Sequence, residues 1–200
     1  MVRTLIFDIG NVLADFNWRA YLAGWKLPEE ERCIVERELF LSPLWKEIDR
    51  GKLSDEEILT RVCSKAPRLE ETIRKIYGGA AVAVSQNDYA PGLLKRLKEQ
   101  GFRIYILSNY GKTFYEERLS HFEFLRYTDG QVVSYQEGHI KPEPEIYEKL
   151  LSRYGICPEE ALFFDDLPEN CRAAEAFGIH TIQVDGYESI LRGLREYGIG

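Results

Sequence analysis

The sequence predicts an α/β fold built on a parallel sheet, and two observations carry that prediction. Short runs of strand-forming residues alternate along much of the chain with segments of helical periodicity. The runs are also almost continuously apolar, which is typical of strands covered on both faces of a parallel sheet. They span residues 5–7, 104–107, 162–164 and 181–184. We expect all four to lie in the centre of one sheet.

Two helices are expected between the later strands. Each follows a proline, which suits the first turn of a helix. Apolar residues then recur at helical spacing, as Leu93, Leu94 and Leu97 after Pro91 and as Ile146, Leu150 and Leu151 after Pro144. Strands connected through such helices are parallel, because the helix returns the chain to the starting side of the sheet.

A helical insertion is expected between residues 16 and 88, where helical periodicity occurs without a convincing strand. Ser54 and Glu57 have the spacing of a capping box, which marks the start of a helix. Because the insertion follows the first strand directly, we expect it to cover the carboxyl end of that strand.

The chain is therefore predicted to fold as two domains. Residues 1–15 and 89–200 form the core, and residues 16–88 form an α-helical cap subdomain inserted into it. A cap must open to admit substrate and close to exclude water, so we expect hinges near residues 15–17 and 85–88.

Composition excludes several classes of partner. The formal net charge of -7 gives no electrostatic reason to bind nucleic acid or anionic lipid. No apolar stretch reaches the roughly 18 residues needed to span a bilayer, and the first residues do not resemble a signal peptide. The four cysteines are far apart, as expected of free thiols. We expect a cytoplasmic protein that acts on a small molecule, and the sequence leaves its oligomeric state open.

Polar residues follow the predicted strands at the points where the strands end. Asp8 follows the first strand, Ser108 and Asn109 follow the second, and Asp165 and Asp166 follow the third. Ligands of parallel sheets bind outside these carboxyl ends. Singly, each acid is best interpreted as a helix cap or loop residue, but three carboxylates in one crevice repel one another unless a cation lies among them. An all-oxygen site of this kind suits Mg²⁺.

Chemical roles can then be assigned from the residue types. Asp8 is the candidate nucleophile, because a carboxylate can form an acyl phosphate and divide phosphoester hydrolysis into two displacements. Ser108 and the backbone N–H of Asn109 are candidate donors to the phosphoryl oxygens. Lys141, which the following proline holds out of helical geometry, supplies positive charge.

These segments, taken in order, resemble the four motifs of the haloacid dehalogenase (HAD) superfamily in its phosphatase branch. The motifs are Phe7 to Val12, Leu107 to Asn109, Lys141 to Pro144 and Phe164 to Asn170. The resemblance implies a Rossmann-like core, and the insertion resembles the helical C1 cap of that superfamily. Arg50 to Glu56 is similar to cap sequence in bacterial phosphatases of the α-glucose-1-phosphate type.

The resemblance also implies a metal site. Asp166 would bind Mg²⁺ beside Asp8, the backbone carbonyl of Gly10 would supply another ligand, and Asp165 would bind the metal directly or through water. Asn170 would orient these ligands. In the same way, Ser108, Asn109 and Lys141 would bind the phosphate.

One position departs from the pattern. Most phosphatases of the superfamily have an aspartate two residues after the nucleophile as general acid and base, whereas this chain has Gly10. Asn11 or Asp15 could instead order a water molecule. An anomeric sugar phosphate has a better leaving group and needs less protonation, which favours substrates such as glucose-1-phosphate. Trp45 is a candidate to stack on the sugar, although packing within the cap is the commoner role of such a residue.

The sequence thus predicts a Mg²⁺-dependent phosphatase of small phosphorylated metabolites that works through an aspartyl phosphate. Two alternatives remain. A haloacid dehalogenase would use the same aspartate without metal, and Asp165 and Asp166 argue against it. A non-catalytic module that only binds phosphometabolites is supported by Gly10 alone.

Overall fold

The computed structural model describes all 200 residues and contains the predicted parallel sheet. Five parallel strands lie in the order β5-β4-β1-β6-β7, so β1 is in the middle. Their bounds are β1 Thr4–Phe7, β4 Arg103–Ser108, β5 Gly130–Val133, β6 Ala161–Asp165 and β7 His180–Gln183. The predicted fold class is confirmed.

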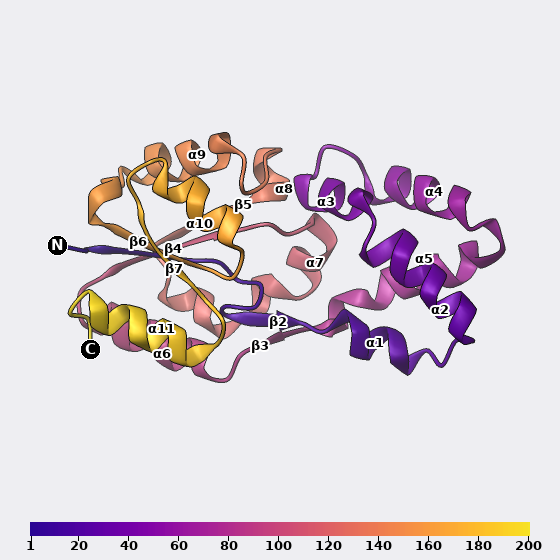
Figure 1. The fold of residues 1–200 in the computed structure, drawn as a ribbon, viewed down its shortest axis with the longest axis horizontal. Coiled ribbons are helices and arrows are strands. Elements are labelled where there is room, and N and C mark those ends of the chain that lie inside the picture. The colour runs from indigo at the N-terminus through magenta and orange to yellow at the C-terminus, as the bar shows by residue number, and fades with distance from the viewer.

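Helices cover both faces of this sheet (Figure 1). Side chains alternate across β1: Leu5 and Phe7 pack in one cluster with α6 and α11, whereas Ile6 packs in a second cluster with α9 and α10. The bounds of these helices are α6 Tyr89–Glu99, α9 Pro144–Tyr154, α10 Pro168–Glu175 and α11 Tyr187–Glu196. Burial on both faces explains why the central strands are apolar throughout.

The edges of the sheet differ from the prediction. β7 is an edge strand with exposed ends at His180 and Gln183, so its apolar character does not place it in the centre. β5 was not predicted, because only Val132 and Val133 of its four residues are apolar and that signal is too short to detect.

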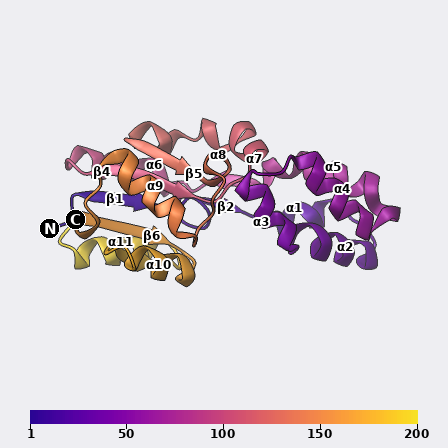
Figure 2. The same ribbon diagram turned by 90° about the horizontal axis from the view of Figure 1, so that it is seen from above.

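A helical unit lies between β2 (Ala14–Phe16) and β3 (Val84–Gln86), which pair antiparallel. The sequence indicated no strand here, since three residues are too few to show periodicity. Figures 1 and 2 place the helices of this unit beyond the end of the sheet opposite both chain termini. The carboxyl ends of the parallel strands therefore face it.

The helices of this unit are α1 Trp18–Gly24, α2 Glu29–Val35, a π-helical turn Glu36–Phe40, α3 Pro43–Arg50, α4 Asp55–Lys65 and α5 Glu70–Gly79. The capping box at Ser54 and Glu57 is present, with both reciprocal hydrogen bonds made. Residues such as Ile58 and Ile73 bury their side chains in the same apolar cluster as Phe7 of β1. The helical unit therefore packs continuously with one face of the sheet.

The remaining helical segments are α7 Lys112–Glu117 and α8 Ser134–Glu137, with short 3-10 turns at Pro67–Leu69, Ala80–Ala83, Leu119–His121, Glu123–Tyr127 and Pro158–Glu160. None of the helices is both long and apolar enough to cross a lipid bilayer.

Candidate active site

The carboxyl ends of β1, β4 and β6 bring several polar side chains together. Asp8 follows β1, Ser108 ends β4 and Asp165 ends β6, and the three residues are buried. Lys141 reaches them from the loop before α9, with Nζ at 3.0 Å from Asp8 Oδ1 and 2.6 Å from Asp165 Oδ2. One buried cation thus bridges two carboxylates from neighbouring strands.

Three donors hold a single oxygen of Asp8. Oδ1 accepts hydrogen bonds from the backbone N–H of Ile9 at 2.7 Å, from the Ser108 hydroxyl at 2.5 Å and from the Lys141 ammonium. Oδ2 accepts none of these bonds, and Asp8 lines a cavity. One oxygen therefore fixes the carboxylate while the other is left to react.

Burial sets the protonation of this pair. Desolvation raises the pKa of Asp8 to about 6, and the negative charge of Asp165 adds to the rise, while Lys141 and the Ser108 hydrogen bond oppose it. Burial also works against the charge on Lys141, but Asp165 and Asp8 together raise its pKa above the usual value. The ammonium stays charged and keeps Asp8 available as a carboxylate near neutral pH.

Asp165 is fully enclosed and has no free oxygen. Its Oδ2 accepts from Lys141, and its Oδ1 accepts from the backbone N–H of Leu167 and from Asn170 Nδ2, both at 2.9 Å. It does not line the cavity. Of the two roles expected for this residue, the geometry favours contact with a metal through water over direct ligation.

Asp166 and Gly10 lie on the cavity side of the same edge. Asn11 Nδ2 donates to Asp166 Oδ2 at 2.9 Å, which joins the loop after β1 to the loop after β6. Burial raises the pKa of Asp166, and the bond from Asn11 lowers it. The side chain of Asn11 therefore positions Asp166.

The donor set fits a hard divalent cation. Carboxylate oxygens of Asp8, Asp165 and Asp166 lie within 4.8 Å of one another, and Gly10 borders the same space. Asn170 Oδ1 is buried without a hydrogen-bond partner, which suits a donor such as the water of a hydrated cation. Oxygen ligands with room for water are the environment that Mg²⁺ prefers.

The segments that carry these side chains are fixed to one another. Asn109 Oδ1 accepts from the backbone N–H of Lys141 at 2.8 Å, and Asn109 Nδ2 donates to the Lys141 carbonyl at 3.0 Å. The side chain of Asn109 therefore positions the lysine, while Asn109 also lines the cavity where its backbone was expected to meet phosphate.

Helix α3 of the helical unit approaches this edge closely. Ser42 caps its start, and Gly51, with a φ of 71°, ends it. A Cβ atom at Gly111, just after Asn109 and Tyr110, would lie 2.4 Å from Ile48 Cγ2. The hydroxyl of Ser134, the first residue of α8, donates to the Asp49 carbonyl at 2.5 Å and accepts from the backbone N–H of Tyr110 in the loop after β4, so the end of α3 is linked to that loop.

A cavity of about 370 Å³ lies between α3 and the sheet edge. Its core side carries Asp8, Gly10, Asn109, Lys141 and Asp166. Five aromatic residues also line the cavity: Phe16 of β2, Trp18 and Trp45 of the helical unit, and Tyr110 and Phe114 from the segment after β4. Trp45 stacks on Phe16 with ring centroids 5.6 Å apart and also borders the cavity. It therefore combines packing with access to a ligand.

The sequence did not single out several residues of the cavity wall: Phe16, Lys46, Asp49 and Phe114. Asp49 had a detectable signal, because it lies four residues after Trp45 and side chains at that spacing share one helix face. Asp15, considered as a replacement for the acid missing at position 10, is exposed on β2 and does not line the cavity.

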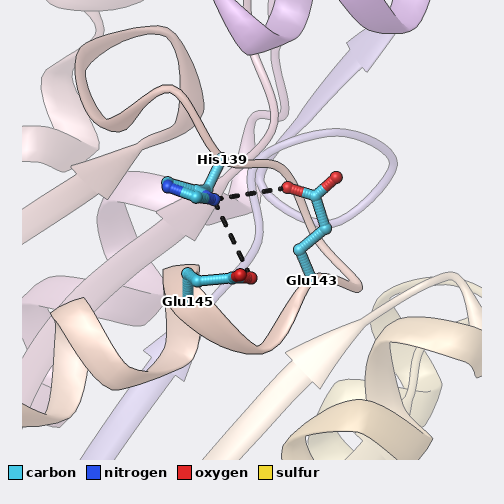
Figure 3. A group of neighbouring side chains, drawn as sticks. All are labelled: His139, Glu143 and Glu145. Carbon is cyan, nitrogen blue, oxygen red and sulfur yellow. Dashed lines mark ion pairs between the residues drawn. The ribbon is translucent and has the colours of Figure 1, made fainter.

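A second charged cluster lies outside the cavity, before α9. His139 Nδ1 lies 3.6 Å from a Glu143 oxygen and 3.8 Å from Glu145 (Figure 3). Glu143 also pairs with Arg50 of α3 at 2.7 Å and accepts from the backbone N–H of Ile140. This cluster links the end of α3 to the loop that carries Lys141.

Comparison with known proteins gives concordant results. The chain is 29% identical over 92% of its length to a D-ribitol-5-phosphate phosphatase from Bacteroides thetaiotaomicron, of which it covers 92%. It is 28% identical over 88% of its length to the sesquiterpene phosphatase astK of Aspergillus oryzae, of which it covers 87%. A HAD family enzyme from Bacteroides thetaiotaomicron, solved with magnesium and inorganic phosphate, superposes with a TM-score of 0.74 at 22% identity, covering 93% of this chain and 96% of that one.

The family assignment rests on a match along most of the sequence. Residues 2–178 match the family model described as haloacid dehalogenase-like hydrolase. That range includes all four sequence motifs and the helical unit between the first two. The chain is therefore a member of the haloacid dehalogenase-like hydrolases.

Proposed function

We propose that this protein is a Mg²⁺-dependent phosphatase of small phosphorylated metabolites, with Asp8 as the nucleophile. The observation that carries the proposal is the asymmetry of the Asp8 carboxylate. Three donors fix Oδ1, Oδ2 accepts none of these bonds, and Asp8 lines a cavity that Asp166 and Lys141 also line. A carboxylate held in this way is oriented for attack on a phosphorus atom in the cavity.

The other residues of the core side then have defined tasks. Lys141 neutralises the Asp8 carboxylate and the incoming phosphoryl group, which reduces repulsion between two anions. Ser108 orients Asp8, and Asn109 lines the cavity where its backbone N–H would donate to the phosphoryl oxygens. Asp8, Asp166 and the Gly10 carbonyl would hold Mg²⁺, with Asp165 and Asn170 acting through water. The bound cation would supply further positive charge to the phosphoryl oxygens.

The helical unit supplies the site for the rest of the substrate, and we assign residues 16–88 to a cap on this ground. A cavity of about 370 Å³ has room for a small metabolite. Its aromatic wall, with Trp45, suits the apolar face of a sugar ring. Sugar phosphates, with glucose-1-phosphate as the first compound to test, are the proposed substrates.

Two relatives support phosphatase activity while leaving the substrate open. One is named a D-ribitol-5-phosphate phosphatase and the other a sesquiterpene phosphatase, so the two names share only the phosphatase reaction. The buried charges of this chain would contact the phosphoryl group, and the cap would contact the rest of the substrate. The two motif-four aspartates count against metal-free dehalogenation, and the arrangement around Asp8 counts against a module that binds without turnover.

The test is a phosphate-release assay on a panel of sugar phosphates and alkyl phosphates, with Mg²⁺ omitted and then restored. The wild-type protein is expected to release phosphate only with the metal, and the Asp8→Asn variant is expected to release none. A protein that binds members of the panel without releasing phosphate from any would contradict the proposal and support the non-catalytic alternative.

A further inference from the structure

The core side of the cavity lacks a proton donor for the proposed phosphatase reaction. A phosphomonoester with an alkyl leaving group needs a proton as the phosphorus–oxygen bond breaks. Gly10 has no side chain to give it, and its backbone borders the cavity where a side chain would project toward Tyr110. The proton donor must therefore come from another element that borders the same space.

Four carboxyl groups line the cavity, and three are unsuited to this task. Asp8 is the nucleophile, Asp166 is held by Asn11 in the candidate metal site, and Glu169 is an exposed residue of α10. The fourth, Asp49, comes from α3 on the cap side, where the leaving group must lie if the phosphoryl group faces Asp8. We propose that Asp49 is the general acid and base of this protein, a task that the cap performs in place of residue 10.

The end of α3, which carries Asp49, packs in close contact with the core. The Ser134 hydroxyl donates to the Asp49 carbonyl and accepts from the backbone N–H of Tyr110 at 3.0 Å, so one side chain ties α3 to the loop after β4. Only glycine fits at two points of this contact, since a Cβ at Gly111 would meet Ile48 and a Cβ at Gly51 would lie 2.6 Å from the Tyr135 carbonyl oxygen. Asp49 is thus a cap residue held in place by the core.

The surroundings of the carboxyl suit proton exchange near neutral pH. Burial raises the pKa of Asp49 to about 7, and the negative charge of Asp8 adds to the rise. The backbone N–H of Gly111 and the charge of Lys141 act in the opposite direction. Lys46 of α3 also lines the cavity, and the Tyr77 and Tyr110 side chains lie within the electrostatic reach of Asp49.

The two half-reactions balance with this residue. In the first, Asp8 Oδ2 bonds to phosphorus, the bond from phosphorus to the leaving oxygen breaks, and protonated Asp49 gives its proton to that oxygen to release the alcohol. In the second, the Asp49 carboxylate takes a proton from water as the water oxygen bonds to phosphorus. The bond to Asp8 then breaks, which releases phosphate and restores both side chains.

The experiment compares leaving groups in the Asp49→Asn variant. Alkyl phosphomonoesters, such as glycerol phosphate, need a protonated leaving oxygen, whereas p-nitrophenyl phosphate does not. Because Asp49 also serves in the breakdown of the aspartyl phosphate, the comparison is made on the first turnover. We expect alcohol release from the alkyl substrate in that turnover to slow by about 100-fold, and the first-turnover burst of p-nitrophenol from p-nitrophenyl phosphate to stay near the wild-type rate. Glu169→Gln, the matched loss of an exposed carboxyl at the same cavity, is expected to leave both rates near those of the wild type.

A rescue variant distinguishes the loss of a proton donor in Asp49→Asn from a disturbance of the structure. A Cβ atom is accommodated at residue 10, because the nearest atom to it is the Tyr110 hydroxyl at 3.9 Å, an ordinary van der Waals distance. Gly10→Asp in the Asp49→Asn background is expected to recover part of the alkyl phosphatase rate. An equal slowing of the first turnover for both substrates in Asp49→Asn, or an unchanged first-turnover rate for the alkyl substrate, would overturn the inference. A wild-type protein that releases phosphate from neither substrate would instead overturn the proposed function.

Discussion

The two sides of the cavity are built on different principles. The core side consists of buried charges whose partners are fixed, since Lys141 is 3% exposed and contacts two carboxylates. The cap side consists of the half-buried aromatic residues Phe16, Trp18 and Trp45 with one carboxyl, Asp49. The difference indicates a division of labour, in which the sheet edge handles the invariant phosphoryl group and the cap handles the variable leaving group.

The largest effect is expected from the core nucleophile. Asp8→Asn removes the attacking carboxylate while keeping its shape, and should lower kcat by at least about 10⁴-fold in a phosphate-release assay. The matched control is Asp15→Asn, which changes an exposed aspartate outside the cavity and should leave kcat near that of the wild type. Substantial turnover by the Asp8 variant would place the nucleophile elsewhere.

The next effect concerns stability of the core side. Lys141→Met leaves Asp8 and Asp165 facing each other without a cation, and should cost about 3–5 kcal/mol in urea unfolding at pH 8. Burial raises the pKa of Asp8 to about 6 in the wild type, and loss of Lys141 removes an influence that lowers this pKa. Asp8 in the variant therefore takes up a proton as the pH falls, and the repulsion diminishes. The loss should therefore be smaller at pH 5 than at pH 8.

A surface lysine provides the control for that experiment. Lys149 pairs with Glu137 at 3.2 Å while its side chain is 40% exposed, so Lys149→Met should cost no more than about 1 kcal/mol at either pH. A Lys141→Met variant as stable as this control would mean that the buried bridge does not organise the core side.

A smaller effect is expected from the aromatic wall of the cap. Trp45→Leu removes the ring that borders the cavity, and should raise KM for a sugar phosphate by about tenfold. Competitive inhibition by inorganic phosphate should not change, because phosphate contacts only the core side. Equal weakening of sugar phosphate and inorganic phosphate would show that the two sides do not act separately.

The smallest effect is expected where cap and core meet outside the cavity. Arg50→Gln breaks the ion pair between Arg50 and Glu143, and both side chains of this pair are partly exposed to solvent. The variant should lose no more than about 1 kcal/mol in urea unfolding, and less in high salt, because solvent screens such pairs. A loss of several kcal/mol would show that this pair stabilises the docking of α3.

The contrast between the two sides also explains what the sequence could predict. Asp8, Ser108 and the Asp165–Asp166 pair follow apolar strands, and a parallel sheet brings strand ends together whatever the details of packing. The order of motifs was therefore enough to gather these residues. β5 escaped detection because two valines do not make a periodic signal.

The cap side could not be predicted in the same way. Asp49 reaches the cavity because Gly111 and Gly51 allow α3 to approach the core, and such a contact between distant residues leaves no local pattern. The spacing of Trp45 and Asp49 shows that they share a helix face but not which neighbour that face meets. Helix docking is decided by tertiary packing, which a single sequence does not display.

The most direct test of this account is rapid acid quenching of the protein with substrate and Mg²⁺, followed by mass spectrometry of its peptides. We expect a phosphoryl group on the peptide that contains Asp8, no such group after Asp8→Asn, and accumulation of the same adduct when Asp49→Asn reacts with p-nitrophenyl phosphate and its breakdown is slowed. Phosphate release without any phosphorylated Asp8 peptide, or a phosphoryl group on another residue, would contradict the account.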